Sequence, residues 1–114
     1  MNGDAQVQAY AAADFSSGDQ ATIEAIQRLL SRTSPLPPNP LVVDLGCGPG
    51  NITLRLAGLF PKARIIGIDG AESMLAVARE RAQQQQLEIS FLCQTLQEVL
   101  RGALLGQADL IVSN

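Results

Sequence analysis

The sequence predicts an α/β domain built on a doubly wound parallel sheet. From Leu41 onward, short apolar runs alternate with amphipathic helical segments, which is the pattern of repeated strand–helix units. A glycine-rich turn follows the first run, and Asp69 ends the second. Sheets of this kind run in the order 3-2-1-4, so we expect the first strand inside the sheet and the third at its outer edge.

The first 40 residues are predicted to form an arm, a helix and a proline-rich linker ahead of the sheet domain, which spans residues 41–114. Residues 1–15 show little periodicity, and four prolines between residues 35 and 40 hold the linker extended. Between them a helix is expected over about 18–31, because Ser17 and Gln20 have capping-box spacing. Four apolar residues share one face of this helix: Ile23, Ile26, Leu29 and Leu30.

The sheet domain is expected to alternate four strands with three helices. The strands are predicted at 41–45, 64–68, 87–93 and 109–113. One helix follows the glycine turn and ends at Pro61, a second covers about 71–85, and a third runs from Leu96 to about Gly106.

The third and fourth strands differ in pattern. Residues 87–93 alternate apolar and polar side chains, as a half-exposed edge strand does. The unbroken run Leu110-Ile111-Val112 predicts a strand that is buried on both faces and has a neighbour on each side. Because the sequence stops at Asn114, we expect a truncated sheet whose fourth strand favours self-association by edge pairing.

Composition fits one small domain and excludes several classes of partner. The chain has 114 residues, of which 46% are apolar and 17% charged, and eight basic residues are scattered among eleven acids. No basic stripe is therefore available for nucleic acid. The longest apolar runs have about five residues, against the roughly 20 that a membrane span needs, and the polar start is not a signal peptide. We expect a cytoplasmic protein without a nucleic-acid or membrane partner.

The chain contains no histidine, and its two cysteines, Cys47 and Cys93, lack the spacing of metal ligands. The missing imidazole excludes a catalytic triad, a histidine base and most transition-metal sites, so we expect no metal. A reducing compartment keeps both cysteines as thiols. Any activity must therefore need little acid–base catalysis from this chain.

The residues that carry chemistry lie at the tips of the first two strands. The segment Asp44-Leu45-Gly46-Cys47-Gly48-Pro49-Gly50-Asn51 turns the first strand into a helix, and Asp69 follows Gly50 by 19 residues. Glycines let the backbone approach a ligand, and an acid at the second strand tip accepts hydrogen bonds from ribose hydroxyls. The pattern predicts a Rossmann-like site for a cofactor that contains adenosine.

The glycine spacing selects among such cofactors. Dinucleotide sites use G-x-G-x-x-G, whereas this loop has G-x-G-x-G with Asp44 two residues ahead of the first glycine. A carboxylate there repels a phosphate but suits a cofactor that carries an ammonium and a sulfonium, as S-adenosyl-L-methionine does. A nicotinamide or flavin dinucleotide and a cofactor-free turn are the alternatives.

At these positions the chain resembles the class I S-adenosylmethionine-dependent methyltransferases. Residues 42–50 are similar to the family's first motif, and residues 66–69 with the following Ser73-Met74-Leu75 resemble its second. The resemblance implies a Rossmann-like fold and a small-molecule acceptor, and it places Tyr10 and Phe15 over the cofactor. It also implies that the cofactor is bound by Asp44, Gly46, Cys47, Gly48, Gly50, Asp69, Gly70 and Met74.

The third motif departs from the family's pattern, and the start of the fourth motif is compatible with two kinds of methyltransferase. Members of this kind usually end the third strand with an acid that accepts the adenine amino group, where this chain has Gln94 and Thr95, which also offer acceptors. Residues 108–114 resemble the start of the fourth motif, which places Asn114 beside the methyl group. An Asn at this position occurs in N-methyltransferases of amides and bases and also in small-molecule methyltransferases.

Methyl transfer suits a chain without histidine, because the sulfonium is already activated and catalysis rests on positioning. No catalytic residue is identified, and Asp14 and Tyr10 are candidate bases only through their expected place at the pocket mouth. The sequence thus predicts the cofactor-binding part of a small-molecule methyltransferase. The alternatives are an N-methyltransferase of a protein amide or nucleobase and a non-catalytic methyltransferase-like module that self-associates.

Overall fold

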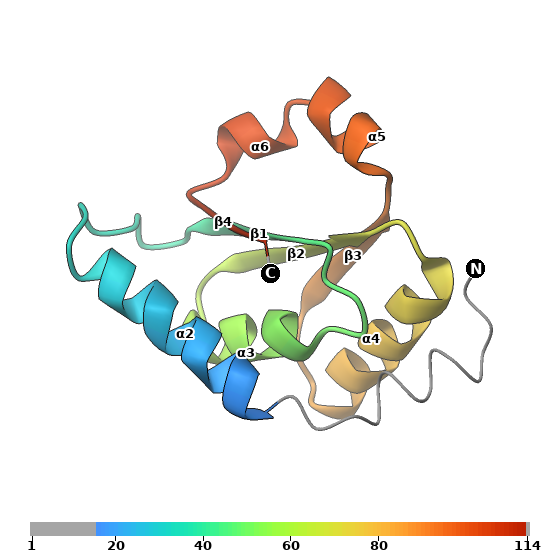
Figure 1. Cartoon of the computed structure of the whole chain (residues 1–114), viewed down its shortest axis with the longest axis horizontal. Helices are drawn as coiled ribbons and strands as arrows, with labels where there is room; N and C mark the ends of the chain where they lie inside the picture. The colour runs from blue at the N-terminus through green and yellow to red at the C-terminus, as the bar shows by residue number, and fades with distance from the viewer. Residues whose placement is uncertain (1–15, 114) are drawn as a thin grey trace.

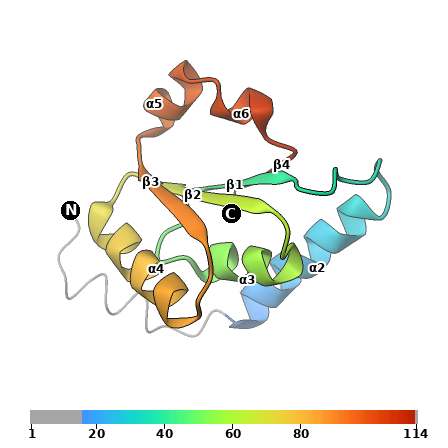
Figure 2. The same ribbon diagram turned by 180° about the vertical axis from the view of Figure 1, so that it is seen from behind.

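A computed structural model describes residues 16–113, which form a four-stranded parallel sheet with helices on both faces. The strands are β1 (Leu41–Leu45), β2 (Arg64–Asp69), β3 (Ile89–Cys93) and β4 (Leu110–Ser113). The helices are α2 (Ser16–Leu30), α3 (Asn51–Leu59), α4 (Glu72–Gln84), α5 (Leu96–Arg101) and α6 (Leu104–Gln107). Helices α2, α3 and α4 cover one face, and α5 and α6 lie across the other (Figures 1 and 2).

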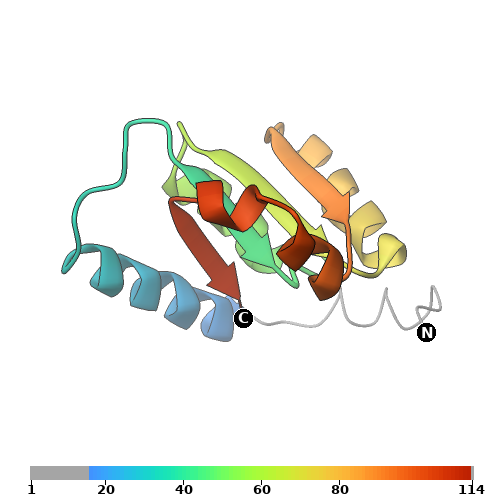
Figure 3. The ribbon, with the colours of Figure 1, turned by 90° about the horizontal axis from the view of Figure 1, so that it is seen from above.

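The strand order is β3-β2-β1-β4, which confirms the predicted order. Strand β1 is central, with Val43 level with Ile66 of β2 and Ile111 of β4. Seen from above, the strands point the same way, so their carboxyl ends gather along one edge of the sheet (Figure 3). Open parallel sheets bind ligands outside this edge, which makes the strand tips the place to search for a site.

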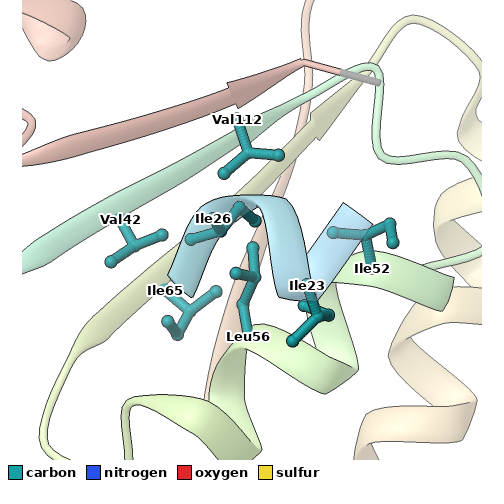
Figure 4. Packing of buried hydrophobic residues seen from close by; sticks show 7 residues of the cluster. All are labelled: Ile23, Ile26, Val42, Ile52, Leu56, Ile65 and Val112. Carbon is teal, nitrogen blue, oxygen red and sulfur yellow. The ribbon is translucent and has the colours of Figure 1, made fainter. Parts of the chain in front are cut away.

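The larger core fills the space between the sheet and helices α2 and α3. Its side chains come from two helices and three strands and meet around Leu56, which is fully buried (Figure 4): Ile23, Ile26, Val42, Ile52, Leu56, Ile65 and Val112. Burial of one such side chain contributes about 1.5–3 kcal/mol. Helix α2 therefore shares its core with the sheet that follows the linker.

The predicted start and apolar face of the first helix were partly wrong. Helix α2 begins at Ser16, so Ser17 lies inside it and does not cap it at residue 18. Leu29 was expected on the buried face but is 57% exposed. It lies about 120° around the helix from Ile23, so the two side chains face different directions and only Ile23 reaches α3.

The last predicted helix is two short helices. The backbone of Gly102 is extended, with φ −88° and ψ −179°, and it separates α5 from α6. Glycine is unfavourable inside a helix, and α5 gains its own start from a capping box between Thr95 and Glu98. These short helices cover Val43, Ile66 and other residues of β1 and β2.

Strand β4 is buried on one face only, contrary to the prediction of burial on both. Val112 points into the core with α2 and α3, whereas Ile111 is 44% exposed on the opposite face. Ile111 is absent from the core that α5 and α6 form with β1 and β2. In the described part of the chain, no helix is long and apolar enough to span a bilayer.

Candidate functional site

The glycine loop between β1 and α3 adopts a conformation that favours its glycines. Gly46, Gly48 and Gly50 have φ values of +69°, +56° and +89°, in the left-handed region. The N–H groups of Gly46 and Cys47 both donate to the carbonyl of Ile68, at 2.7 and 2.9 Å. The loop is therefore fastened to the tip of β2 through its backbone.

The side chain of Asp69 strengthens this attachment. Its Oδ2 accepts a hydrogen bond from Gly48 N–H and its Oδ1 one from Ala71 N–H, both at 2.9 Å. A carboxylate oxygen can accept two hydrogen bonds, so each oxygen retains acceptor capacity after these contacts. Asp69 thus holds the loop and still offers both oxygens to a ligand with neighbouring hydroxyl groups.

A pocket of about 340 Å³ lies beside Asp69 at the carboxyl ends of the strands. It brings together five of the predicted site residues: Gly46, Asp69, Gly70, Gln94 and Thr95. Its remaining lining was not predicted and consists of Leu45, Ile68, Leu96, Val99 and Ser113. Leu45, Ile68 and Ser113 lie at or beside the carboxyl ends of strands. Because ligands of parallel sheets bind at these ends, the position of these residues in the sequence could have predicted them.

Asp44 lies behind the loop, outside the pocket lining, and is only 2% exposed. Thr53 of α3, itself fully buried, donates a hydrogen bond from Oγ1 to Asp44 Oδ2 at 2.8 Å. Burial raises the pKa of Asp44 from 3.8 to about 6, and the charge of Asp69 adds to this while the Thr53 bond opposes it. A nearby cation favours the ionised form, so the two carboxylates favour a positively charged ligand group.

Thr53 was missed in the sequence. Its signal was a hydroxyl residue between the apolar residues Ile52 and Leu56, on the face that α3 turns toward the sheet. A buried polar side chain needs a partner, and β1 offers Asp44 as the acceptor.

Besides Asp44, four predicted residues in the described part of the chain are absent from the pocket lining: Cys47, Gly48, Gly50 and Met74. Cys47 packs into a core with Leu75 and Phe91, and burial, with the charges of Asp44 and Asp69, raises its pKa to about 12, so it is a neutral thiol. Gly50 is buried against α4, and Met74 is half-buried outside the lining.

The side of the glycine loop that faces the core packs closely against neighbouring side chains. A Cβ on Gly50 would lie 3.1 Å from Ala78 Cβ. One on Gly67, in the middle of β2, would lie 2.8 Å from the Phe91 ring and 3.1 Å from Cys47 Sγ. The loop is therefore packed on its core side and accessible on its pocket side.

The two predicted adenine acceptors differ in their contacts. Thr95 Oγ1 accepts a hydrogen bond from Glu98 N–H at 3.2 Å, and Thr95 N–H donates to Glu98 Oε1 at 2.9 Å. The backbone N–H of Gln94 donates to Asp69 O at 3.1 Å, which keeps Gln94 next to the acid. Tyr10, Asp14, Phe15 and Asn114 lie outside the described residues.

A larger hollow, of about 1020 Å³, lies at the opposite edge of the sheet. Its lining includes Lys62 and Arg64 before and at the start of β2, and Glu88 before β3, but no residue of the glycine loop. Ligands of parallel sheets bind at the carboxyl ends of the strands. The smaller pocket beside Asp69 is therefore the candidate site.

The chain matches the model of a known protein family and is similar in sequence to known methyltransferases. The family model for a methyltransferase domain matches residues 42–114. The chain is 56% identical over 64 residues to a trans-aconitate 2-methyltransferase of Variovorax paradoxus, covering 56% of this chain and 24% of that protein. It is 42% identical over 73 residues to a malonyl-[acyl-carrier protein] O-methyltransferase of Bacillus cytotoxicus, covering 64% and 24%. The chain spans about a quarter of the length of these relatives.

Solved structures show the same fold. Magnesium protoporphyrin IX methyltransferase from Synechocystis, solved with bound S-adenosylmethionine, is 27% identical with a TM-score of 0.65, and the match covers 84% of this chain and 43% of that one. The bifunctional kinase-methyltransferase WbdD is 26% identical with a TM-score of 0.68, over 87% of this chain and 21% of that one. The described sheet is thus similar to part of each larger protein.

Proposed function

Because this chain belongs to the methyltransferase domain family, we propose that it forms the cofactor-binding part of an S-adenosylmethionine-dependent methyltransferase. The observation that carries the proposal is the arrangement of Asp69 and the loop of left-handed glycines around one pocket. The structure of magnesium protoporphyrin IX methyltransferase with bound S-adenosylmethionine, which has the same fold, supports the choice of cofactor.

The residues present fit this cofactor. A Cβ on Gly46 would meet no protein atom within 4 Å, so a ligand can approach the backbone there. We assign the ribose hydroxyls to Asp69 and the adenine amino group to Gln94 or Thr95, which line the pocket beside this acid and retain acceptor capacity. Asp44 acts from behind the loop, where its charge favours the methionine ammonium. When bound, the cofactor supplies a methyl group on a positively charged sulfur.

We further propose a small carboxylate as the methyl acceptor. The two relatives are named for trans-aconitate and for a malonyl group, and both molecules carry carboxyl groups. A carboxyl group is ionised at neutral pH and reacts without first losing a proton to a base. A chain without histidine is compatible with such an acceptor. The N-methyltransferase alternative rests on Asn114, which lies outside the described residues.

Calorimetric titration with S-adenosylhomocysteine tests the cofactor site. We expect saturable binding to the folded protein, and its absence would contradict the proposal. A thermal shift with NAD but none with S-adenosylmethionine would instead favour the dinucleotide alternative. Incubation with radiolabelled S-adenosylmethionine and trans-aconitate tests the acceptor, and transfer to amines without transfer to carboxylates would contradict this part of the proposal.

The open edge of β4 supports a further proposal, self-association by strand pairing. Among the described residues β4 pairs with β1 alone, and its Ile111 is 44% exposed. Unpaired strand edges are templates for pairing with another chain. Sedimentation should show a mass that rises with protein concentration, and a monomer at high concentration would refute this assembly.

Two more expectations remain proposals. The free thiols of Cys47 and Cys93 support a reducing location such as the cytoplasm. The family match over residues 42–114 supports a division of the chain after residue 40, between the linker and the cofactor-binding part.

A further inference from the structure

Arg81 of α4 contacts the glycine loop from outside the candidate pocket. Its Nη1 donates to Pro49 O at 3.1 Å and to Asn51 Oδ1 at 2.6 Å, across at least 30 residues of sequence. Pro49 and Asn51 flank Gly50, which has φ +89° and precedes α3. A single guanidinium nitrogen therefore holds the chain on both sides of a left-handed residue.

The location of this arginine is unusual for a helix start. The amino end of a helix carries partial positive charge, which favours an acidic residue over a cation. Helix α3 has no acid in its first turn, and its N-cap, Gly50, provides no side-chain hydrogen bond. Arg81 gains instead from charge-assisted hydrogen bonds, and the two acceptors named above belong to the loop and to the residue that follows it.

The Arg81 contacts complete a set of attachments around the loop. Gly48, next to Pro49, donates to Asp69 on the pocket side, and Thr53, two residues after Asn51, donates to Asp44 beneath it. Arg81 lines a separate hollow of about 500 Å³, which it shares with Gly50 and Asn51, and it is absent from the lining of the pocket beside Asp69. Among the described residues, Arg81 therefore contacts the loop from a side other than that of the pocket beside Asp69.

We propose that Arg81 is a positioning residue that fixes the glycine loop in the conformation that binds the cofactor. The inference rests on the proposed function, because the ligand is the cofactor assigned above. Without the guanidinium, the backbone from Gly48 to Asn51 samples other conformations, and binding must restore the competent one. The affinity for the cofactor then falls in proportion to the population of the binding-competent loop conformation.

Arg81→Met tests this role, because methionine keeps an apolar stem and removes the donors. Arg79→Met is the matched control: Arg79 lies on the same helix and binds Glu72 and the carbonyl of Phe91 instead of the loop. Calorimetry with S-adenosylhomocysteine should show a dissociation constant about tenfold higher for Arg81→Met. We expect less than a twofold change for Arg79→Met. Arg81→Lys, which keeps a donor, should recover part of the affinity.

Hydrogen exchange of residues 46–54 in the unliganded protein provides a readout that does not depend on the cofactor. We expect faster exchange in Arg81→Met and unchanged exchange in Arg79→Met. Equal affinity losses in both variants, or unchanged exchange in Arg81→Met, would overturn the inference. If the wild-type protein binds no S-adenosylhomocysteine, the proposed function fails, while exchange still decides whether Arg81 orders the loop. If Arg81→Met does not fold, Arg81→Lys and Asn51→Ala replace it in both measurements.

Discussion

The carboxylate of Asp69 and the backbone N–H of Gly48 are joined by a 2.9 Å hydrogen bond between residues 21 positions apart. The acid expected to bind ribose therefore also ties the glycine loop to the tip of β2. Its second oxygen accepts a hydrogen bond from Ala71 N–H, where the chain enters α4. One side chain thus holds both the glycine loop and the entry to α4 at the tip of β2.

Asp69→Asn should weaken cofactor binding and lower stability together. The amide replaces one acceptor oxygen by a donor, so one backbone N–H loses its partner, at a cost of about 1–2 kcal/mol. We expect the dissociation constant for S-adenosylhomocysteine to rise more than about tenfold by calorimetry. Asp109→Asn is the control, because Asp109 accepts a 2.8 Å bond from Leu41 N–H at the far end of β1. An equal loss of affinity in the control would contradict a specific role for Asp69.

Asp44→Asn should stabilise the unliganded protein at high pH. Burial raises the pKa of Asp44 to about 6, above its ordinary 3.8, so the folded state binds the proton more tightly than the unfolded state. Stability then falls as the pH rises from about 4 to about 6, and the buried charge costs up to about 3 kcal/mol above this range. Asparagine removes this charge while keeping an acceptor for Thr53. Its melting temperature should exceed that of the wild type at pH 7.5, with a smaller difference at pH 4.5. A pH-independent difference would show that Asp44 is not the titrating group.

Gly50→Ala and Gly46→Ala should separate packing from ligand approach. Both positions have positive φ, so each substitution costs about 1–3 kcal/mol through backbone strain. At Gly50 the new Cβ also meets Leu54 Cδ1 at 2.9 Å and Ala78 Cβ at 3.1 Å, whereas at Gly46 it meets nothing within 4 Å. Denaturant unfolding should show a larger loss for Gly50→Ala. Relative to the loss of stability that each variant shows, Gly46→Ala should lose more cofactor affinity than Gly50→Ala. A larger relative loss for Gly50→Ala would contradict the assignment of Gly46 to the ligand side of the loop.

The two cysteines should differ in reactivity. Cys47 is buried with a pKa of about 12, whereas Cys93 at the end of β3 is exposed. Since the thiolate is the reactive form, iodoacetamide at pH 8 should modify Cys93 alone in the native protein. Mass spectrometry of Cys93→Ser should show no native labelling and one modification after denaturation. Rapid labelling of Cys47 in the native state would show that the loop opens.

The sequence predicted the order of the strands because hydrophobic runs, a glycine turn and an edge-like third strand all favour one topology. It also placed Gly46, Asp69, Gly70, Gln94 and Thr95 at strand tips, where the structure brings them to one pocket. The strand order, the glycine turn and Asp69 rest on local patterns in consecutive residues, whereas Gly70, Gln94 and Thr95 were implied by the resemblance to the class I methyltransferases. Element ends were less predictable: α2 starts at Ser16 instead of about residue 18, and the extended backbone of Gly102 interrupts an apolar periodicity that runs on through Leu104.

Partners that are distant in sequence were not predictable from such patterns. Thr53 differs from any surface threonine only once α3 is laid against β1 and Asp44. Arg81 was not among the predicted site residues, because helical periodicity does not show that its guanidinium reaches Pro49 and Asn51. Cys47 was placed at the ligand, yet the turn directs its side chain to the core with Phe91.

The absence of a side chain at Gly67 has a consequence for how this domain tolerates sequence change. The Phe91 ring and the Cys47 sulfur occupy the space that a Cβ at residue 67 would need. Volume at the three positions is therefore shared, because interiors are close-packed and leave little room. In homologous proteins, a larger residue at 67 should occur together with smaller residues at 91 or 47. Variation in the middle of β2 is thereby coupled to variation in the loop that we propose contacts the cofactor.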